Sequence, residues 1–110
     1  MNNVYIKRHP VKGRCVHASR KILAGELIEE NHVITYPFLE KGNKILDWSM
    51  EWTDTEDALA LGNINLLNHS EDSNCGIEND FVNMTKRVYA NFDIEKDEEL
   101  TIHYGCELWF

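Results

Sequence analysis

The alternation of apolar and polar positions predicts a chain built mostly of short strands. Val4 to Arg8 alternates along its length, and Glu26 to Tyr36 is rich in β-branched and apolar residues. Further strands are predicted at Ile77 to Asn83 and at Lys86 to Asn91, joined by a turn. A last strand, from Leu100 to Tyr104, ends beside a glycine. The pattern indicates a mainly β chain with little helix.

Turn-forming residues mark two stretches between these strands. Pro10 and Gly13 predict a turn before a second strand, or its edge, at Cys15 to Ala18. Residues 66–74 hold an Asn-His-Ser and a second asparagine, side chains that favour bonds to nearby backbone over a helix or a ladder. Taken singly, such an asparagine could cap a turn, and such a histidine could be an ordinary core residue.

The stretch 45–60 is ambiguous between a helix and an irregular insert. Trp48 and Trp52 lie four residues apart, so they would share one face of a helix. They could equally line an insert beside a binding groove, because aromatic side chains are enriched at binding surfaces. Core packing is the ordinary role of buried tryptophans, and contact with a substrate is the alternative.

Length and composition indicate one soluble globular domain over residues 1–110. Hydrophobic residues make up 43% and charged residues 27% of the chain, which is ordinary for such a domain. No apolar run reaches the length of a membrane span or forms the core of a signal peptide. We therefore expect no membrane partner and an intracellular protein, in the cytoplasm or, for a viral or effector protein, in the host nucleus.

The chain is acidic, with 19 Asp and Glu against 11 Lys and Arg and a formal net charge of -8. Direct binding of nucleic acid is not expected, because neutralising phosphates needs clustered cations. An acidic surface would attract a basic partner, such as a peptide rich in lysine and arginine. Solubility alone is the other interpretation of this charge.

The cysteines argue against a structural framework of disulfides or zinc. Cys15, Cys75 and Cys106 are odd in number, and no C-x-x-C spacing occurs. We therefore predict no metal site.

Two motifs carry the chemistry of this sequence. An N-H-S-x-x-x-N pattern occupies residues 68–74, and E-E-L-T-x-x-Y-G occupies residues 98–105. Together they resemble the paired signature of the SET-domain protein-lysine methyltransferases, most closely the short viral and bacterial members. The turn at Gly13 and the A-L-A-L-G of residues 58–62 follow the same family order. The resemblance implies a SET-domain (β-clip-like) fold of several small sheets with a C-terminal pseudoknot, one SET domain over residues 1–110.

The resemblance also implies S-adenosylmethionine (SAM) as the cofactor. The residues at its cofactor-binding positions are Lys12, Gly13, Arg14, Cys15, Asn68, His69 and Tyr104. Tyr104 matches the catalytic tyrosine. A phenol with a pKa near 10 is a poor base at neutral pH, so its expected role is to orient the amine. Cys15 stands where the family has a glycine, and it brings a Cβ close to the cofactor.

The substrate channel is expected at Leu66, Ile102, Trp109 and Phe110. Ile102 replaces the Phe or Tyr of many family members, and its smaller side chain leaves room for more than one methyl group. Trp109 is expected to close the lysine channel, since the cysteine-rich segment that follows the Y-G of larger members is absent.

Two functions compete on this evidence. The leading one is a SAM-dependent protein-lysine N-methyltransferase acting on a basic protein segment such as a histone-like tail. The alternative is a catalytically degenerate SET-type module that binds a basic peptide, motivated by Cys15 and by Phe92 in place of the family's arginine. Because small members with a short C-terminus complete their site by dimerising, we also expect a homodimer.

Overall fold

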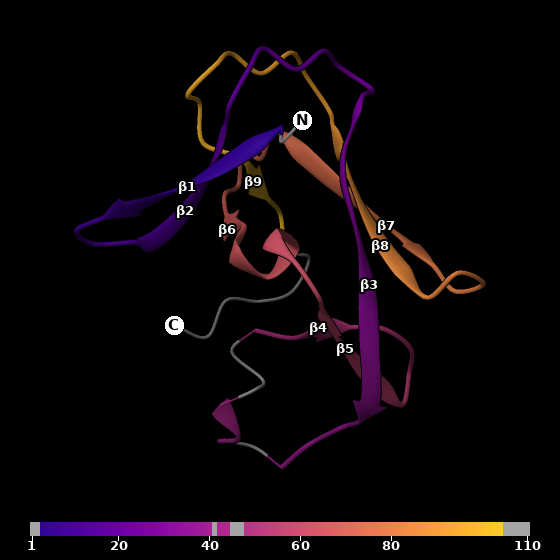
Figure 1. The fold of residues 1–110 in the computed structure, drawn as a ribbon. Coiled ribbons are helices and arrows are strands. Elements are labelled where there is room, and N and C mark those ends of the chain that lie inside the picture. Colours follow the sequence, from indigo (N-terminus) through magenta and orange to yellow (C-terminus); the bar gives the residue numbers. More distant parts are fainter. Residues whose placement is uncertain (1–2, 41, 45–47, 105–110) are drawn as a thin grey trace.

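The computed structural model describes residues 3–40, 42–44 and 48–104, which fold mainly into strands (Figure 1). The strands are β1 (Val4–His9), β2 (Gly13–Ala18), β3 (Leu27–Pro37), β4 (Met50–Glu51), β5 (Glu56–Ala60), β6 (Asn68–His69), β7 (Cys75–Asp80), β8 (Thr85–Ala90) and β9 (Thr101–Ile102). A short 3₁₀ helix, η2 (Asn63–Leu66), precedes β6. Within this part of the chain, no helix is long and apolar enough to cross a membrane.

The largest sheet is organised around the long strand β3. Its order is β4-β5-β3-β8-β7, and every neighbouring pair is antiparallel. The first half of β3 pairs with β8, and the second half pairs with β5. A register shift between Leu27 and Glu29 bends the strand where it enters the sheet. One strand thus joins the β7–β8 hairpin to the β4–β5 hairpin (Figure 1).

The β1–β2 hairpin forms a second sheet, and its outer edge binds the turn before β9. Leu100 N donates to Val16 O at 2.8 Å, and Ala18 N donates to Glu98 O at 2.9 Å. Asp97 N returns a bond of 2.8 Å to Ala18 O. Backbone bonds therefore hold the E-E-L-T motif against the N-terminal hairpin (Figure 1).

The third sheet is the parallel pair β6–β9, and it brings the two motifs side by side. Asn68 faces Thr101 and His69 faces Ile102 in its register. Ser70 N extends the pairing with a bond of 3.0 Å to Ile102 O. This pairing places the C-terminal segment against the N-H-S loop. The predicted mainly β architecture, with several small sheets and little helix, is confirmed for the described residues.

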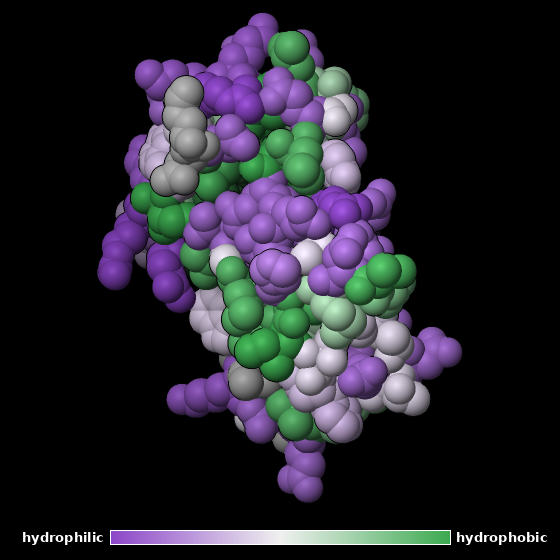
Figure 2. All heavy atoms as spheres, turned by 45° about the vertical axis from the view of Figure 1, so that its right-hand side comes forward, coloured by the Kyte–Doolittle hydropathy of each residue, from purple (hydrophilic) through white to green (hydrophobic). Residues whose placement is uncertain are grey.

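A continuous apolar core connects the three sheets. Its fully buried members include Val16 on β2, Val88 on β8 and Leu100 before β9. Ile22 and Ile94 are also fully buried and exchange backbone bonds of 2.9 and 2.8 Å. Burying one such side chain stabilises a fold by roughly 1.5–3 kcal/mol. On the face shown in Figure 2, exposed apolar atoms lie in patches interrupted by a polar band.

The ambiguous stretch 45–60 is a hairpin rather than a helix in the part that the structure describes, residues 48–60. Trp48 and Trp52 therefore do not share a helix face. Trp52 is buried, with its ring centroid 4.7 Å from that of Phe81, whereas the side chain of Trp48 is half exposed. Of the two roles that the sequence left open, core packing therefore applies to Trp52 and not to Trp48.

Strand ends differ from those expected from the sequence. Of the predicted strand from Leu100 to Tyr104, only Thr101 and Ile102 form the strand β9. The strand predicted from Ile77 to Asn83 ends at Asp80, because the Asp80 carboxylate accepts the backbone N–H groups of Val82 and Asn83 at 3.0 and 2.9 Å and starts a turn.

Candidate active site

Two cavities meet beside the paired motifs. Their volumes are about 580 Å³ and 810 Å³, within the range of small-molecule sites. Four residues line both: Trp48, Asn65, Leu67 and Tyr104. The cavities are therefore neighbours that share a wall.

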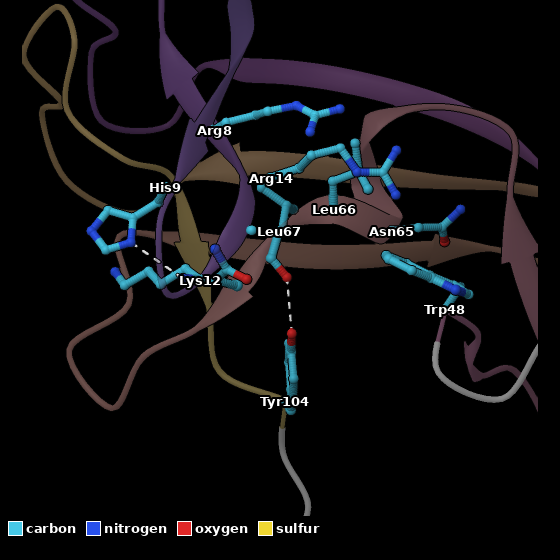
Figure 3. A pocket seen from close by; sticks show the side chains of 11 residues that line it. Arg8, His9, Lys12, Arg14, Trp48, Asn65, Leu66, Leu67 and Tyr104 are labelled. Carbon is cyan, nitrogen blue, oxygen red and sulfur yellow. Dashed lines mark hydrogen bonds between the residues drawn. The ribbon is translucent and has the colours of Figure 1, made fainter. Parts of the chain in front are cut away.

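The first cavity is rich in cations, although the chain as a whole is acidic. The β1–β2 hairpin contributes Arg8, Lys12 and Arg14 to its lining. The guanidinium carbon of Arg14 lies 5.4 Å from the ring centroid of Trp48, a cation–π distance. Figure 3 shows these side chains around the cavity, with Tyr104 at its lower side. Such a lining suits a ligand that carries both an anionic group and an aromatic ring.

A carboxylate outside the cavity lining holds two of the predicted cofactor residues that do line it. Glu99 accepts bonds of 2.8 Å from Lys12 Nζ and of 2.8 Å from Asn68 Nδ2. Burial by itself raises the pKa of the Glu99 carboxyl, but these bonds outweigh it and leave the pKa below its ordinary value. The same bond to Glu99 raises the pKa of Lys12. Glu99 therefore stays ionised and fixes both side chains.

Tyr104 is held at both ends where the cavities join. Its hydroxyl donates to the carbonyl of Leu67 at 3.0 Å, as the dashed line in Figure 3 marks. Its backbone N–H donates to His69 Nδ1 at 3.0 Å, and the two rings lie 5.1 Å apart. A phenol that donates its proton in this way can only accept from a third group. The position suits an orienting role and not a general base.

His69 and His103 lie side by side, and both contact Glu71. Its Nε2 lies 3.1 Å from Glu71 Oε1, and His103 Nε2 lies 3.1 Å from Glu71 Oε2. The hydrogen bond with His69 and then that with His103 lower the pKa of the Glu71 carboxyl. The carboxylate thus bridges the two imidazoles behind Tyr104.

The predicted cofactor residues fall into two groups. The backbone or side chains of Lys12, Gly13, Arg14, Asn68 and Tyr104 line the first cavity. Cys15 and His69 do not. The Cys15 thiol is buried 3.3 Å from Asn68 Nδ2, and its burial, then Glu99, raises its pKa. Cys15 therefore supports Asn68 from behind and brings no bulk into the cavity.

The second cavity contains the predicted channel residue Ile102. Ile102 is buried and lines it together with Cys75, Ile77 and Tyr104. Burial raises the pKa of the Cys75 thiol to about 12, so this cysteine is an apolar wall and not a nucleophile.

The other predicted channel residues have different outcomes. Leu66 lines only the first cavity, and its neighbour Leu67 takes the shared position. Trp109 and Phe110 lie outside the described residues.

Lys86 also lines the second cavity and is almost fully buried. Its Nζ donates to Asn79 Oδ1 at 2.8 Å and lies 5.5 Å from the ring centroid of Trp52. Burial lowers the pKa of Lys86 to about 8. Strand alternation puts Lys86 on the buried face with Val88, a signal that the sequence analysis did not use.

Replacing Lys86 by methionine is expected to stabilise the fold by about 2 kcal/mol at pH 7. The pKa of Lys86 falls from about 10.4 in the unfolded chain to about 8 in the folded protein, which costs the fold about 3 kcal/mol at pH 7. Methionine removes this cost but also loses the hydrogen bond to Asn79, which offsets about 1 kcal/mol of the gain. The cost is fully present below the folded pKa and falls as the pH rises toward the unfolded pKa, because only the unfolded chain then keeps the proton. Urea unfolding at pH 7 and at pH 10 should show the advantage disappearing.

The matched control for this prediction is Lys7→Met, at an exposed position of β1. It should change stability by no more than about 0.5 kcal/mol. An equal effect of Lys86→Met at both pH values would show that the ammonium is not desolvated.

Several lining residues escaped the sequence analysis. Arg8 and His9 come from the predicted N-terminal strand and its turn. Glu99, which binds Lys12 and Asn68 without lining the cavity, lies inside a motif but had no assigned role. A cation just before a predicted glycine turn was the available signal for Arg8. Nothing in the sequence shows that Asn65 faces the cavities.

Comparison with known proteins identifies the fold. Residues 13–105 match the sequence profile of the SET domain. The chain belongs to the SET-domain family. The family inferred from the motifs at residues 68–74 and 98–105 is thus confirmed, and the two cavities are those of a SET domain.

One relative of this SET domain is a histone-lysine methyltransferase by name, and a second is named as a histone methyltransferase. It is 31% identical over 104 residues to the histone-lysine N-methyltransferase, H3 lysine-37 specific, of Schizosaccharomyces pombe, covering 90% of this chain and 71% of that protein. The crystal structure of a candidate histone methyltransferase of Plasmodium falciparum has a TM-score of 0.80 and 28% identity over 100% of this chain and 99% of that chain. CpSET8 of Cryptosporidium shares the fold, with a TM-score of 0.68 and 21% identity over 96% of this chain and 58% of that chain.

Proposed function

We propose that this SET domain is a SAM-dependent protein-lysine N-methyltransferase that acts on a basic protein segment such as a histone tail. The observation that carries the proposal is the place of Tyr104, whose side chain lies in the wall shared by the two cavities. A cofactor in the first cavity and a lysine entering from the second would meet beside its hydroxyl.

The residues of the first cavity fit SAM. SAM carries a carboxylate, an amino group and a purine ring. Arg8 and Arg14 can hold the carboxylate, since guanidinium groups match carboxylates in geometry and charge. Asn68, fixed by Glu99, presents an amide, and Trp48 presents an aromatic face. When bound, SAM supplies an electrophilic methyl group on its sulfonium.

The residues around Tyr104 can orient an incoming amine. The phenol O–H of Tyr104 donates a hydrogen bond to the carbonyl of Leu67, so the phenol oxygen can accept a hydrogen bond from an N–H of the lysine. Such a contact aims the nitrogen lone pair, and orientation of this kind supplies much of the rate in displacement reactions. Ile102 and Cys75 give the second cavity apolar walls, which favour the neutral form of the amine.

Charge and relatives support a basic substrate. The net charge of -8 attracts lysine-rich segments, and the S. pombe relative is named for a histone lysine. The homodimer and the intracellular location stay predictions. Cys15, the main reason for a degenerate binding module, faces the interior and leaves the cavity open, which favours the enzyme over that alternative.

Calorimetric titration of SAM into the purified protein tests the cofactor site. Wild type is expected to bind, and Asn68→Ala is expected to bind at least about 10-fold more weakly. The variant removes an amide from the cavity wall, together with its bond to Glu99. A hydrogen bond to a charged group contributes about 1.5–3 kcal/mol.

The matched control is Asn83→Ala, which removes an exposed amide bound to Asp80 in the β7–β8 turn, outside both cavities. It should bind SAM as wild type does. Wild-type protein that binds no SAM, with or without a lysine-containing histone-tail peptide, would refute the proposal and leave the binding module.

A further inference from the structure

Three side chains with metal-binding atoms meet behind Tyr104. They are His69 on β6, Glu71 just after it, and His103 just after β9. The ligand atoms all lie within 4.8 Å of one another, and each imidazole Nε2 lies 3.1 Å from a different oxygen of Glu71. The pairing of β6 with β9 creates this cluster, since 32 residues separate Glu71 from His103.

The chemistry of the cluster matches one class of ion. Two imidazoles and a carboxylate suit Zn²⁺ and similar divalent transition metals, whereas Mg²⁺ and Ca²⁺ prefer oxygen ligands. Tetrahedral zinc with bonds of about 2.0–2.1 Å places its ligands about 3.3 Å apart, so small rotations of the exposed side chains would close the set. Glu71 and His103 are exposed, which gives an ion access from solvent.

We propose that His69, Glu71 and His103 form a binding site for Zn²⁺, and that the ion competes with the backbone anchor of Tyr104. The anchor is the hydrogen bond of 3.0 Å from Tyr104 N to His69 Nδ1. Because Tyr104 N is a donor, Nδ1 accepts, and the neutral ring carries its proton on Nε2, which donates to Glu71.

Zinc on Nε2 of His69 would reverse this arrangement. The Nε2 lone pair would bond to the ion, and the ring proton would pass through solvent to Nδ1. Two N–H donors, those of Tyr104 and of His69 Nδ1, would then face each other at the 3.0 Å of the present bond. The anchor must break, so zinc and the anchored Tyr104 exclude each other. The expectation that zinc thereby inhibits methyl transfer rests on the proposed function. The zinc site itself does not depend on that function.

Titration of tag-free, chelator-stripped protein tests the site directly. Calorimetry with Zn²⁺ and absorbance with Co²⁺ should each show one ion per chain. His103→Asn and Glu71→Gln should weaken binding at least about 10-fold, because each removes one of three ligands. His32→Asn, on the exposed part of β3, is the matched control and should bind as wild type. Excess Mg²⁺ should not compete.

Nitrogen–proton correlation spectra test the coupling in the same samples. A single equivalent of Zn²⁺ should move the His69 proton from Nε2 to Nδ1 and shift the Tyr104 amide, in wild type and in His32→Asn. Circular dichroism should show that the ligand variants remain folded. Binding that survives both ligand substitutions, or no binding at all, overturns the site. Binding with an unchanged Tyr104 amide overturns the competition.

Discussion

Tyr104→Phe is expected to slow methyl transfer about 100-fold, the usual loss when one positioned polar group is removed from a reacting centre. The variant keeps the ring, which packs 5.1 Å from that of His69, and the backbone bond to His69. It loses only the hydroxyl that donates to Leu67 in the shared wall. A lysine amine would then enter without its acceptor, so the loss should appear in kcat. The affinity for SAM should stay within about 5-fold, since a neutral hydrogen bond contributes about 1 kcal/mol. Mass spectrometry of a lysine peptide and calorimetry with SAM measure the two quantities.

Tyr89→Phe is the matched control for this prediction. Tyr89 lies on β8, and it lines neither cavity. Its variant should methylate at the wild-type rate. If Tyr104→Phe retained full activity, the hydroxyl would have no part in the reaction, and the wall between the cavities would need another explanation.

Gly62→Ala is expected to destabilise the protein by about 3 kcal/mol, at the upper end of overpacking effects. A Cβ at Gly62 would lie 2.6 Å from Asn31 Oδ1 and closer still to Asn31 Nδ2. Asn31 is buried and cannot swing away, because its Oδ1 accepts from Ile64 N at 3.1 Å and its Nδ2 donates to Glu29 at 2.8 Å. Either the backbone shifts or those bonds break. Urea unfolding by circular dichroism measures the loss.

A double variant separates the steric cause from others. Asn31→Ala removes the clashing amide, so Gly62→Ala should cost much less in that background than in wild type. Gly76→Ala is the matched single control: its Cβ would meet only the exposed Asn91 side chain at 3.1 Å, and the cost should stay below about 1 kcal/mol. Equal costs of Gly62→Ala in both backgrounds would contradict the role assigned to Asn31.

The fold could be read from the sequence to a large extent, because its signals are local. Strand alternation located β1, β3 and β8 to within a few residues. The glycine of A-L-A-L-G now has a physical reason, the close approach of Gly62 to Asn31. The stretch that contains Trp48 and Trp52 resisted prediction, because its two aromatic residues fit a helix face and a hairpin equally well.

The candidate site was predictable only in part. The motifs placed Lys12, Asn68 and Tyr104 together, and the structure brings all three to one cavity. No sequence rule shows that Cys15 turns inward behind Asn68, and strand alternation can place Lys86 on the buried face without showing that this face borders a cavity. Those outcomes depend on which side of a strand meets another sheet, and that is decided by packing.

By itself, the sequence determined the family, the mainly β character and the side chains of the two motifs. Motif spacing and period-two alternation are local properties of the chain. Only the tertiary structure decided that His69, Glu71 and His103 form one cluster and that Tyr104 belongs to two cavities. The physical reason is the parallel pairing of β6 with β9, a contact between segments about 30 residues apart that the local patterns of the chain do not specify.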